Sequence, residues 1–260
     1  MIMKHYLSLI TAIQQKKPLD RLDASFVQQF LDRYFQQHPN DLKKLELVSE
    51  AHLARNALFK KIVKEVRSEL NRIYGVFWKS PILALGAHLS TNERLHIYPK
   101  LYSSIFKKTG VPESILDVAA GLNPLSYSYL QTAGFTGTYT AVELSPSDCS
   151  LLQDYFTQSK IHGTVLCANL YTLPKLPSAQ MCFLFKVFDV LEMKGHIFSE
   201  RLIDSLDTSW IVASFSTTTI KGQRMRHPQR GWIEQLCKRK GYSFSTLLYE
   251  NEIFYLIQCR

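Results

Sequence analysis

The chain has 260 residues, of which 46% are hydrophobic and 20% are charged. This excludes a wholly disordered protein and leaves room for one α/β domain with a smaller accessory domain. No run of about 18 apolar residues occurs, so we predict no membrane span and a cytoplasmic protein. The five cysteines and eight histidines lack the spacing of metal ligands or of a disulfide framework, so we expect no metal.

The positive charge is confined to the first part of the chain. Residues 1–110 contain 18 Lys and Arg against 9 Asp and Glu, whereas residues 111–260 contain 13 of each kind. The first part therefore carries the whole formal net charge of +9. This division predicts a basic, anion-binding segment joined to a neutral catalytic or ligand-binding domain.

Residues 1–98 have a helical pattern. Between residues 40 and 74, apolar side chains recur at helical spacing: Phe59, Ile62, Val63, Val66, Leu70 and Ile73. Lys60, Lys64 and Arg67 fall on a separate face of that helix, and Gly75 is a candidate C-cap. For a lone helix such a face is often merely solvated, but the net charge of the segment favours a polyanionic partner.

The segment HLSTNERL (88–95) contains a second helix signal. Ser90 is followed three residues later by Glu93, which is a capping-box pattern. We therefore expect a helix to begin here with Arg94 in its first turn, and Pro99 to mark a break or the start of another helix.

From residue 113 onward, β-branched runs alternate with helical stretches. The expected strands are Ser114–Ala119, Thr138–Glu143, Thr164–Ala168, Met181–Lys186, Trp210–Phe215, Ser243–Tyr249 and Ile253–Cys259. The alternation predicts an α/β fold with a mostly parallel sheet, closed by an antiparallel C-terminal hairpin. This is the arrangement of class I (Rossmann-like) methyltransferases. We place the helical, RNA-binding extension at residues 1–98 and the methyltransferase domain at 99–260.

A candidate cofactor loop follows the first of these strands. Asp117 ends the strand, Gly121 opens the loop, and Pro124 marks the start of the next helix. Ala119 and Ala120 stand where a dinucleotide fingerprint has glycines, so a pyrophosphate ligand is disfavoured. S-adenosylmethionine, which has no phosphates, suits such a loop better.

Two polar residues follow the next two strands. Glu143 ends the second strand, where a carboxylate can accept from both ribose hydroxyls, and Asn169 follows the third strand, where it can contact an adenine edge. Either residue alone is commonplace at a strand end. Their order and spacing after Gly121 favour a nucleoside cofactor.

Four segments resemble a known family. STNERL (90–95), ILDVAAGLNPL (115–125), LFKVFDVLE (184–192) and ASFSTTTIKGQR (213–224) are similar to the aminoglycoside-resistance 16S ribosomal RNA methyltransferases, which modify guanine N7 in the decoding site. The chain departs from the family where Glu143 and Asn169 replace a frequent Asp and where Arg224 is displaced by one residue. We interpret it as a distant member.

The resemblance implies methylation of guanine N7 in helix 44 of 16S rRNA within the 30S subunit, by S-adenosylmethionine, with aminoglycoside resistance as the outcome. It also implies roles: Arg94 would pair with the cofactor's carboxylate, Glu143 would hold the ribose and Asn169 would sit by the adenine. The full set of expected cofactor contacts is Arg94, Asp117, Ala119, Gly121, Asn123, Glu143, Leu144, Asn169, Leu170 and Lys186.

Lys186 and Arg224 are the candidate catalytic residues. Lys186 ends the fourth strand, where a cation can contact the target base, although a lysine at a strand end can also simply reach solvent. Phe188 is more consistent with core packing than with stacking on the base. The basic loop 221–230 follows the fifth strand and either grips phosphates or is solvated. The expected RNA contacts are Lys60, Lys64, Arg67, Ser216, Lys221, Arg224 and Arg226.

Other functions remain open at this point. A methyltransferase of another RNA or of a small molecule would use the same cofactor loop, and an inactive RNA-binding homologue would keep the basic extension. A nicotinamide-dependent reductase is opposed by the missing glycines. We expect a monomer, although the sequence carries no firm signal for it.

Overall fold

The protein is described by a computed structural model covering residues 5–73, 89–172, 175–191, 196–219 and 223–259. It forms two compact units, of which the first comprises Met1–Pro81 and Ser145–Ser147 and the second comprises Ile82–Leu144 and Asp148–Arg260. The expected boundary at residue 98 thus falls inside the second unit. The reason is that Ile97 and Tyr98 are buried in the core of the sheet domain.

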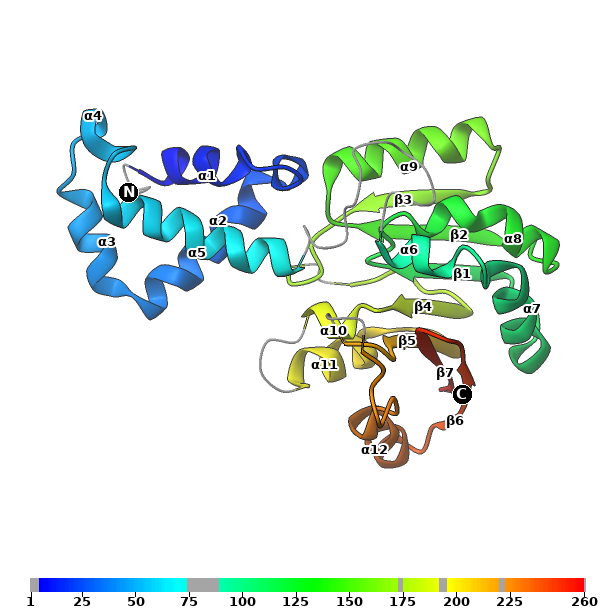
Figure 1. Cartoon of the computed structure of the whole chain (residues 1–260). Coiled ribbons are helices and arrows are strands. Elements are labelled where there is room, and N and C mark those ends of the chain that lie inside the picture. The colour runs from blue at the N-terminus through cyan, green and yellow to red at the C-terminus, as the bar shows by residue number, and fades with distance from the viewer. Residues whose placement is uncertain (1–4, 74–88, 173–174, 192–195, 220–222, 260) are drawn as a thin grey trace. The chain divides into compact units, whose positions relative to one another are not determined.

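The described part of the first unit is helical (Figure 1, blue to cyan). Its elements are α1 (Tyr6–Gln14), the 3-10 helix η1 (Leu19–Arg21), α2 (Ala24–Gln37), α3 (Pro39–Glu46), α4 (Glu50–Leu53) and α5 (Ala57–Ile73). Helix α5 contacts α1, α2 and α3, so it forms the centre of this unit.

Helix α5 confirms the predicted amphipathic helix but begins later than residue 40. The side chain of Asn56 accepts hydrogen bonds from the backbone N–H groups of Leu58 and Phe59 at 2.8 and 3.1 Å, which caps the helix at this point. Its apolar face is buried against α1 and α2, and this face comprises Phe59, Ile62, Val63, Val66 and Leu70. The expected C-cap, Gly75, lies outside the described residues.

The second unit is a three-layer α/β domain. Its helices are α6 (Leu89–Arg94), α7 (Tyr98–Thr109), η3 (Asn123–Ser126), α8 (Tyr127–Thr132), α9 (Pro146–Gln158), α10 (Phe188–Leu191), α11 (Ile197–Ser205) and α12 (Gly231–Lys240). Its strands are β1 (Ser114–Val118), β2 (Thr138–Glu143), β3 (Gly163–Cys167), β4 (Met181–Phe185), β5 (Trp210–Ser216), β6 (Ser243–Leu248) and β7 (Glu252–Gln258).

The seven strands form one sheet in the order β3-β2-β1-β4-β5-β7-β6. The first five are parallel, whereas β7 runs antiparallel to both β5 and β6. Each strand lies within one residue of its predicted bounds. The predicted parallel sheet with a C-terminal antiparallel hairpin is therefore confirmed.

Side chains of alternate strand residues pack into two hydrophobic cores, one on each side of the sheet. In β4, Met181, Phe183 and Phe185 pack on the face covered by α7 and α8, while Cys182 and Leu184 pack on the face covered by α11 and α12. Figure 1 shows these helix pairs on opposite sides of the sheet. Because both faces are covered, ligands can reach the sheet at its edges, and the carboxyl ends of β1 to β5 lie at one of them.

Two predicted helix starts can be compared with the structure. The helix after β1 begins near Pro124, as predicted, because the 3-10 helix η3 starts at Asn123 and α8 follows it at Tyr127. Helix α6 confirms a helix starting in the segment 88–95, but Arg94 lies in its last turn and not in its first. The Glu93 carboxylate pairs with Lys186.

In the part of the chain that the structure describes, no helix is long and apolar enough to cross a membrane. The same residues contain no group of three or more His, Cys, Asp and Glu side chains arranged to hold a metal ion.

Candidate functional site

The loop after β1 has two residues in the left-handed region. Ala119 and Gly121 both have φ 53°, and this turns the backbone sharply at the carboxyl edge of the sheet. The loop is fixed to β2, because Ala120 N–H donates to the Val142 carbonyl at 3.0 Å and Gly121 N–H donates to Glu143 Oε2 at 2.8 Å. Ala119 is exposed and Gly121 is half-buried, so this turn is open to a ligand.

Asp117 lies beneath this loop and is 1% exposed. Burial raises the pKa of Asp117 to about 7, against the opposing effect of hydrogen bonds donated by Tyr139 and Asn123. The carboxyl group therefore supports the loop from inside the protein. The predicted cofactor contact at Asp117 stays a prediction.

Asn123 connects the loop to α7. Its amide nitrogen donates to Asp117 at 2.9 Å, and its amide oxygen accepts from the hydroxyls of Tyr98 and Tyr102 at 2.8 and 3.4 Å. Ser126 bonds to Tyr102 at 2.7 Å and completes this buried cluster. Both ends of the Asn123 amide are thus engaged inside the protein, so its side chain holds the loop in place.

Residues after β2 and β3 lie at the same edge. Glu143 is 6% exposed and its carbonyl accepts from Ala168 N–H at 2.8 Å, which joins the ends of the two strands. The side chain of Asn169 accepts from Tyr171 N–H at 3.0 Å and shapes the turn after β3. Leu144 and Leu170 are both half-buried beside these residues in the chain. The four predicted positions therefore share one edge of the sheet.

Arg94 is buried in a bidentate ion pair. Its Nε contacts Glu252 Oε1 and Oε2 at 3.0 and 2.9 Å, and its Nη2 contacts Oε1 at 2.8 Å. The guanidinium also lies over the ring of Phe185, 4.9 Å from the centroid. Burial alone would lower the pKa of Arg94, but the Glu252 carboxylate and Tyr98 together outweigh it and the net shift is upward.

Lys186 joins the same network from the end of β4. Its amine pairs with Glu93 and lies 3.8 Å from Glu252 Oε2. Its backbone has φ 57° and its N–H bonds to Ser214 on β5, so the residue turns out of the strand at a fixed position. The structure thus brings Arg94 and Lys186 together on one carboxylate, although 92 positions separate them in the sequence.

Sequence reasoning missed Glu252 and Ser214. Glu252 is 2% exposed, starts β7, and accepts from the Ser214 hydroxyl as well as from Arg94. The available signal was a carboxylate directly before an apolar strand run in ENEIFYL. Its partner Arg94 is 158 residues away in the sequence, and the two meet because β7 pairs with β5 and α6 packs at the same edge of the sheet.

The predicted RNA-contacting residues after β5 differ in exposure. Arg224 and Arg226 are exposed, and the Arg224 guanidinium is 4.0 Å from the carboxylate of Glu250. Ser216 is half-buried, with its N–H directed at Asp189 at 3.3 Å. Lys221 lies outside the described residues.

Arg230 fixes the end of this loop. Its guanidinium donates to the carbonyls of Ser216 and Pro228 at 2.9 and 3.0 Å and lies 5.2 Å from the ring centroid of Phe215. Phe188 is 1% exposed and stacks on Phe215, which confirms core packing as its role. Arg224 and Arg226 are therefore presented to solvent from a loop anchored at Arg230.

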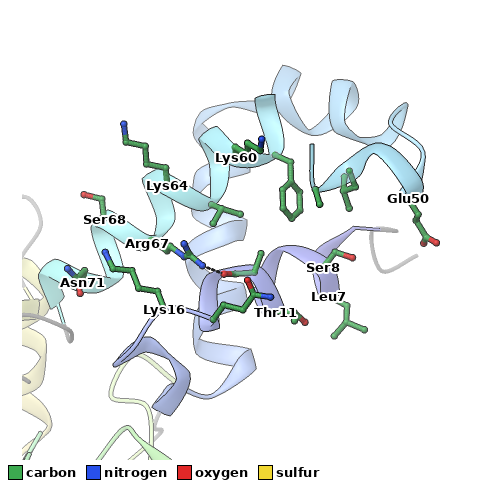
Figure 2. A pocket seen from close by; sticks show the side chains of 16 residues that line it. Leu7, Ser8, Thr11, Lys16, Glu50, Lys60, Lys64, Arg67, Ser68 and Asn71 are labelled. Carbon is green, nitrogen blue, oxygen red and sulfur yellow. Dashed lines mark hydrogen bonds between the residues drawn. The ribbon is translucent and has the colours of Figure 1, made fainter. Parts of the chain in front are cut away.

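A groove of about 930 Å³ runs along α5 and α1 in the helical unit (Figure 2). Lys16, Lys60 and Lys64 line it with exposed side chains, while Phe59 and Val63 contribute buried apolar surface. The Arg67 guanidinium instead donates to the carbonyls of Ala12 and Ile13, near the end of α1. Of the predicted cationic face, Lys60 and Lys64 therefore extend into solvent, whereas Arg67 links α5 to the end of α1.

The carboxyl edge of the sheet suits a nucleoside joined to an amino acid. Hydrogen-bond donors and acceptors for a ribose and a base are present in three places: the turn at Gly121, the carboxylate of Glu143 at the end of β2, and the amide of Asn169 after β3. The buried guanidinium of Arg94 lies near the end of β5 and the start of β7, where it pairs with the Glu252 carboxylate. No part of this edge in the described residues has the glycine-rich turn that a pyrophosphate needs.

The sheet order, the antiparallel last strands and this edge define a class I methyltransferase fold. The family model described as ribosomal RNA methyltransferase (FmrO) matches residues 79–256, which is more than half of the chain. The chain belongs to this family of ribosomal RNA methyltransferases, and the predicted family and enzyme class are confirmed.

Curated relatives agree with this assignment. The 16S rRNA (guanine(1405)-N(7))-methyltransferase of Proteus mirabilis is 25% identical over 213 residues, which cover 76% of this chain and 76% of that protein. An enzyme of the same name from Frankia casuarinae is 26% identical over 180 residues, which cover 67% of this chain and 62% of that protein.

Solved structures share the fold. The 16S rRNA methylase RmtB has a TM-score of 0.74 at 21% identity, with 99% of both chains covered. The 16S rRNA methyltransferase RmtF, solved in complex with S-adenosyl-L-homocysteine, has a TM-score of 0.70 at 19% identity, with 98% of both chains covered. At these identities the likeness establishes the fold alone.

Proposed function

We propose that this protein transfers a methyl group from S-adenosylmethionine to guanine N7 in helix 44, in the decoding region of 16S rRNA within the 30S subunit. On this proposal the modification confers aminoglycoside resistance on the cell. The observation that carries the proposal is the family match over residues 79–256, together with curated relatives named for this reaction. The cofactor is supported by the edge formed by Gly121, Glu143 and Asn169.

S-adenosylmethionine, when bound, supplies a methyl group that is already activated as a sulfonium. Guanine N7 carries a free lone pair, so the protein needs no general base for this transfer. The protein's task is to bind both partners and orient them, and good alignment can contribute roughly 7–11 kcal/mol. Glu143 would hold the ribose, Asn169 the adenine, and Arg94 the carboxylate.

Lys186 is proposed to contact the target guanine or its phosphate. It stands at the carboxyl end of β4 in a left-handed conformation and is 8% exposed. A cation there can donate a hydrogen bond to a guanine oxygen or neutralise a nearby phosphate. Its partner Glu93 has a half-buried side chain, and an RNA ligand could displace that carboxylate.

The remaining grip on RNA is proposed to be electrostatic. Arg224 and Arg226 extend from the loop after β5, and Lys60 and Lys64 extend from α5. Such side chains neutralise phosphates and position the RNA without reading its sequence. Lys221 and Ser216 remain in the proposed RNA-contacting set, whereas Arg67 is proposed to act by holding α5 against α1.

The test is transfer of labelled methyl groups from S-adenosylmethionine to purified 30S subunits, with protein-free 16S rRNA and transfer RNA as parallel substrates. The proposal expects transfer to 30S subunits above both controls. Transfer to another RNA alone would replace the substrate and keep the reaction. Cofactor binding without transfer to any RNA would instead support a small-molecule methyltransferase or an inactive homologue.

A further inference from the structure

The strongest feature outside the expected contacts is the buried carboxylate of Glu252. It accepts from the Arg94 guanidinium at 2.8–3.0 Å, accepts from the Ser214 hydroxyl and lies 3.8 Å from the Lys186 amine. Arg94 is the proposed contact of the cofactor, and Lys186 is the proposed contact of the RNA base. We propose that Glu252 is a positioning residue that fixes these two cations relative to each other.

Arg94 is 1% exposed and also interacts with the Tyr98 side chain, but Glu252 engages only one edge of its guanidinium. Glu252 occupies the edge of the guanidinium formed by Nε and Nη2. A guanidinium has five N–H donors in a planar fork, so its Nη1 end lies beyond this edge. On this proposal the carboxylate of the cofactor would reach the Nη1 end while Glu252 keeps its contacts with Nε and Nη2.

The strand arrangement explains why this carboxylate reaches both cations. Strand β7 runs antiparallel to β5, so its first residue lies at the carboxyl end of the parallel strands, with Glu252 opposite Ser216. Lys186 follows β4 and is bonded through its backbone to Ser214. Glu252 therefore lies where elements from opposite ends of the sequence converge.

Stability alone gives a weak reason for this network. Arg94, Glu252 and Lys186 are 1%, 2% and 8% exposed. Burying ionised groups carries a desolvation penalty that an apolar cluster of the same volume avoids. Together with Glu93, these side chains form a group of two cations and two carboxylates with no net charge. The two cations are therefore held in place without a large electrostatic field at the site. Buried clusters of ionised groups are often found at functional sites.

The inference rests on the proposed function, and a Glu252→Gln variant of the full chain tests it. The change keeps the shape of the side chain and removes its charge. The affinity for S-adenosylhomocysteine, measured by calorimetry, should fall at least about tenfold, as expected for losing a charge-assisted contact. Glu200→Gln is the matched control, because Glu200 pairs with Arg239 on outer helices and should leave this affinity unchanged.

Steady-state kinetics distinguishes positioning from packing. We expect Arg94→Lys mainly to raise KM for S-adenosylmethionine, Lys186→Met mainly to lower kcat, and Glu252→Gln to do both. A purely structural Glu252 would lower the melting temperature and leave the KM and kcat of the folded enzyme unchanged. If Glu252→Gln folds and keeps its affinity for S-adenosylhomocysteine, the proposal is overturned.

A second variant decides the question if Glu252→Gln does not fold. Ser214→Ala removes one donor to the same carboxylate and leaves both ion pairs, so the affinity should fall by a smaller factor; an unchanged affinity would overturn the proposal. Binding of S-adenosylhomocysteine can be measured without RNA. If 30S subunits are not methylated, the same binding experiment therefore still tests the inference. A wild-type chain that does not bind S-adenosylhomocysteine would overturn both.

Discussion

The backbone N–H of Gly121 donates to the Glu143 carboxylate at 2.8 Å, so the loop after β1 is tied to the end of β2 within the protein itself. We expect Glu143→Ala to weaken binding of S-adenosylhomocysteine at least about tenfold, because it removes a charged acceptor of roughly 1.5–3 kcal/mol. Calorimetry measures this. Asp154→Asn, an exposed carboxylate on α9, is the control, and equal affinities of the two variants would exclude Glu143 from the site.

The raised pKa of Asp117 predicts a dependence of stability on pH. The folded protein holds a proton on this group up to about pH 7, whereas the unfolded chain releases it near the ordinary pKa of about 4. The contribution of Asp117 to the free energy of unfolding is therefore full below pH 4 and declines as the pH rises to 7. Asp117→Asn should remove this decline.

Denaturant titrations of wild type and Asp117→Asn between pH 4 and 8 test this. The difference in unfolding free energy should shift progressively in favour of the variant as the pH rises, and then level off above pH 7. Comparing the two proteins cancels the opposite contributions of Asp23 and Asp41, whose pKa values are lowered. A difference that is constant with pH would show that the carboxyl group titrates at its ordinary value.

The strands and the edge of the sheet were predictable because they depend on local patterns. Each strand has a β-branched or aromatic run, and Gly121, Glu143 and Asn169 each follow a strand. The partners of Arg94 and Lys186 were not predictable. They depend on β7 pairing with β5 and on α6 packing at the sheet edge, and no periodicity in the sequence encodes such distant contacts. Arg67 likewise has the spacing of a solvated cation, yet it bonds to α1.

The protein is expected to tolerate the substitution Ala119→Gly. The φ of 53° at Ala119 costs a residue with a Cβ roughly 1–2 kcal/mol, and glycine avoids this strain while adding freedom to the unfolded chain. The free energy of unfolding of Ala119→Gly should therefore match or exceed that of wild type. Its buried neighbour Ala120 is the control, and Ala120→Gly should lower stability by about 0.5–1 kcal/mol. Clear destabilisation by Ala119→Gly would contradict the left-handed turn.

Lys60 and Lys64 are expected to contribute to RNA affinity through phosphates. Replacing both by Ala should weaken binding to 30S subunits and reduce the slope of log affinity against log salt by roughly 1–2. The affinity for S-adenosylhomocysteine should not change. Replacing Lys107 and Lys108, which are exposed on α7, removes the same charge and serves as the control. If log affinity falls with log salt by the same slope for both double variants, Lys60 and Lys64 only contact solvent and do not bind RNA.

The most direct test of the central claim is chemical mapping of the modified base. 30S subunits would be incubated with the protein and S-adenosylmethionine, and their 16S rRNA cleaved at N7-methylguanosine and read by primer extension. The proposed function predicts one new cleavage, at a guanine of helix 44 in the decoding region, which is absent without the cofactor. Labelled methyl groups incorporated without any cleavage, or cleavage only outside that region, would contradict it.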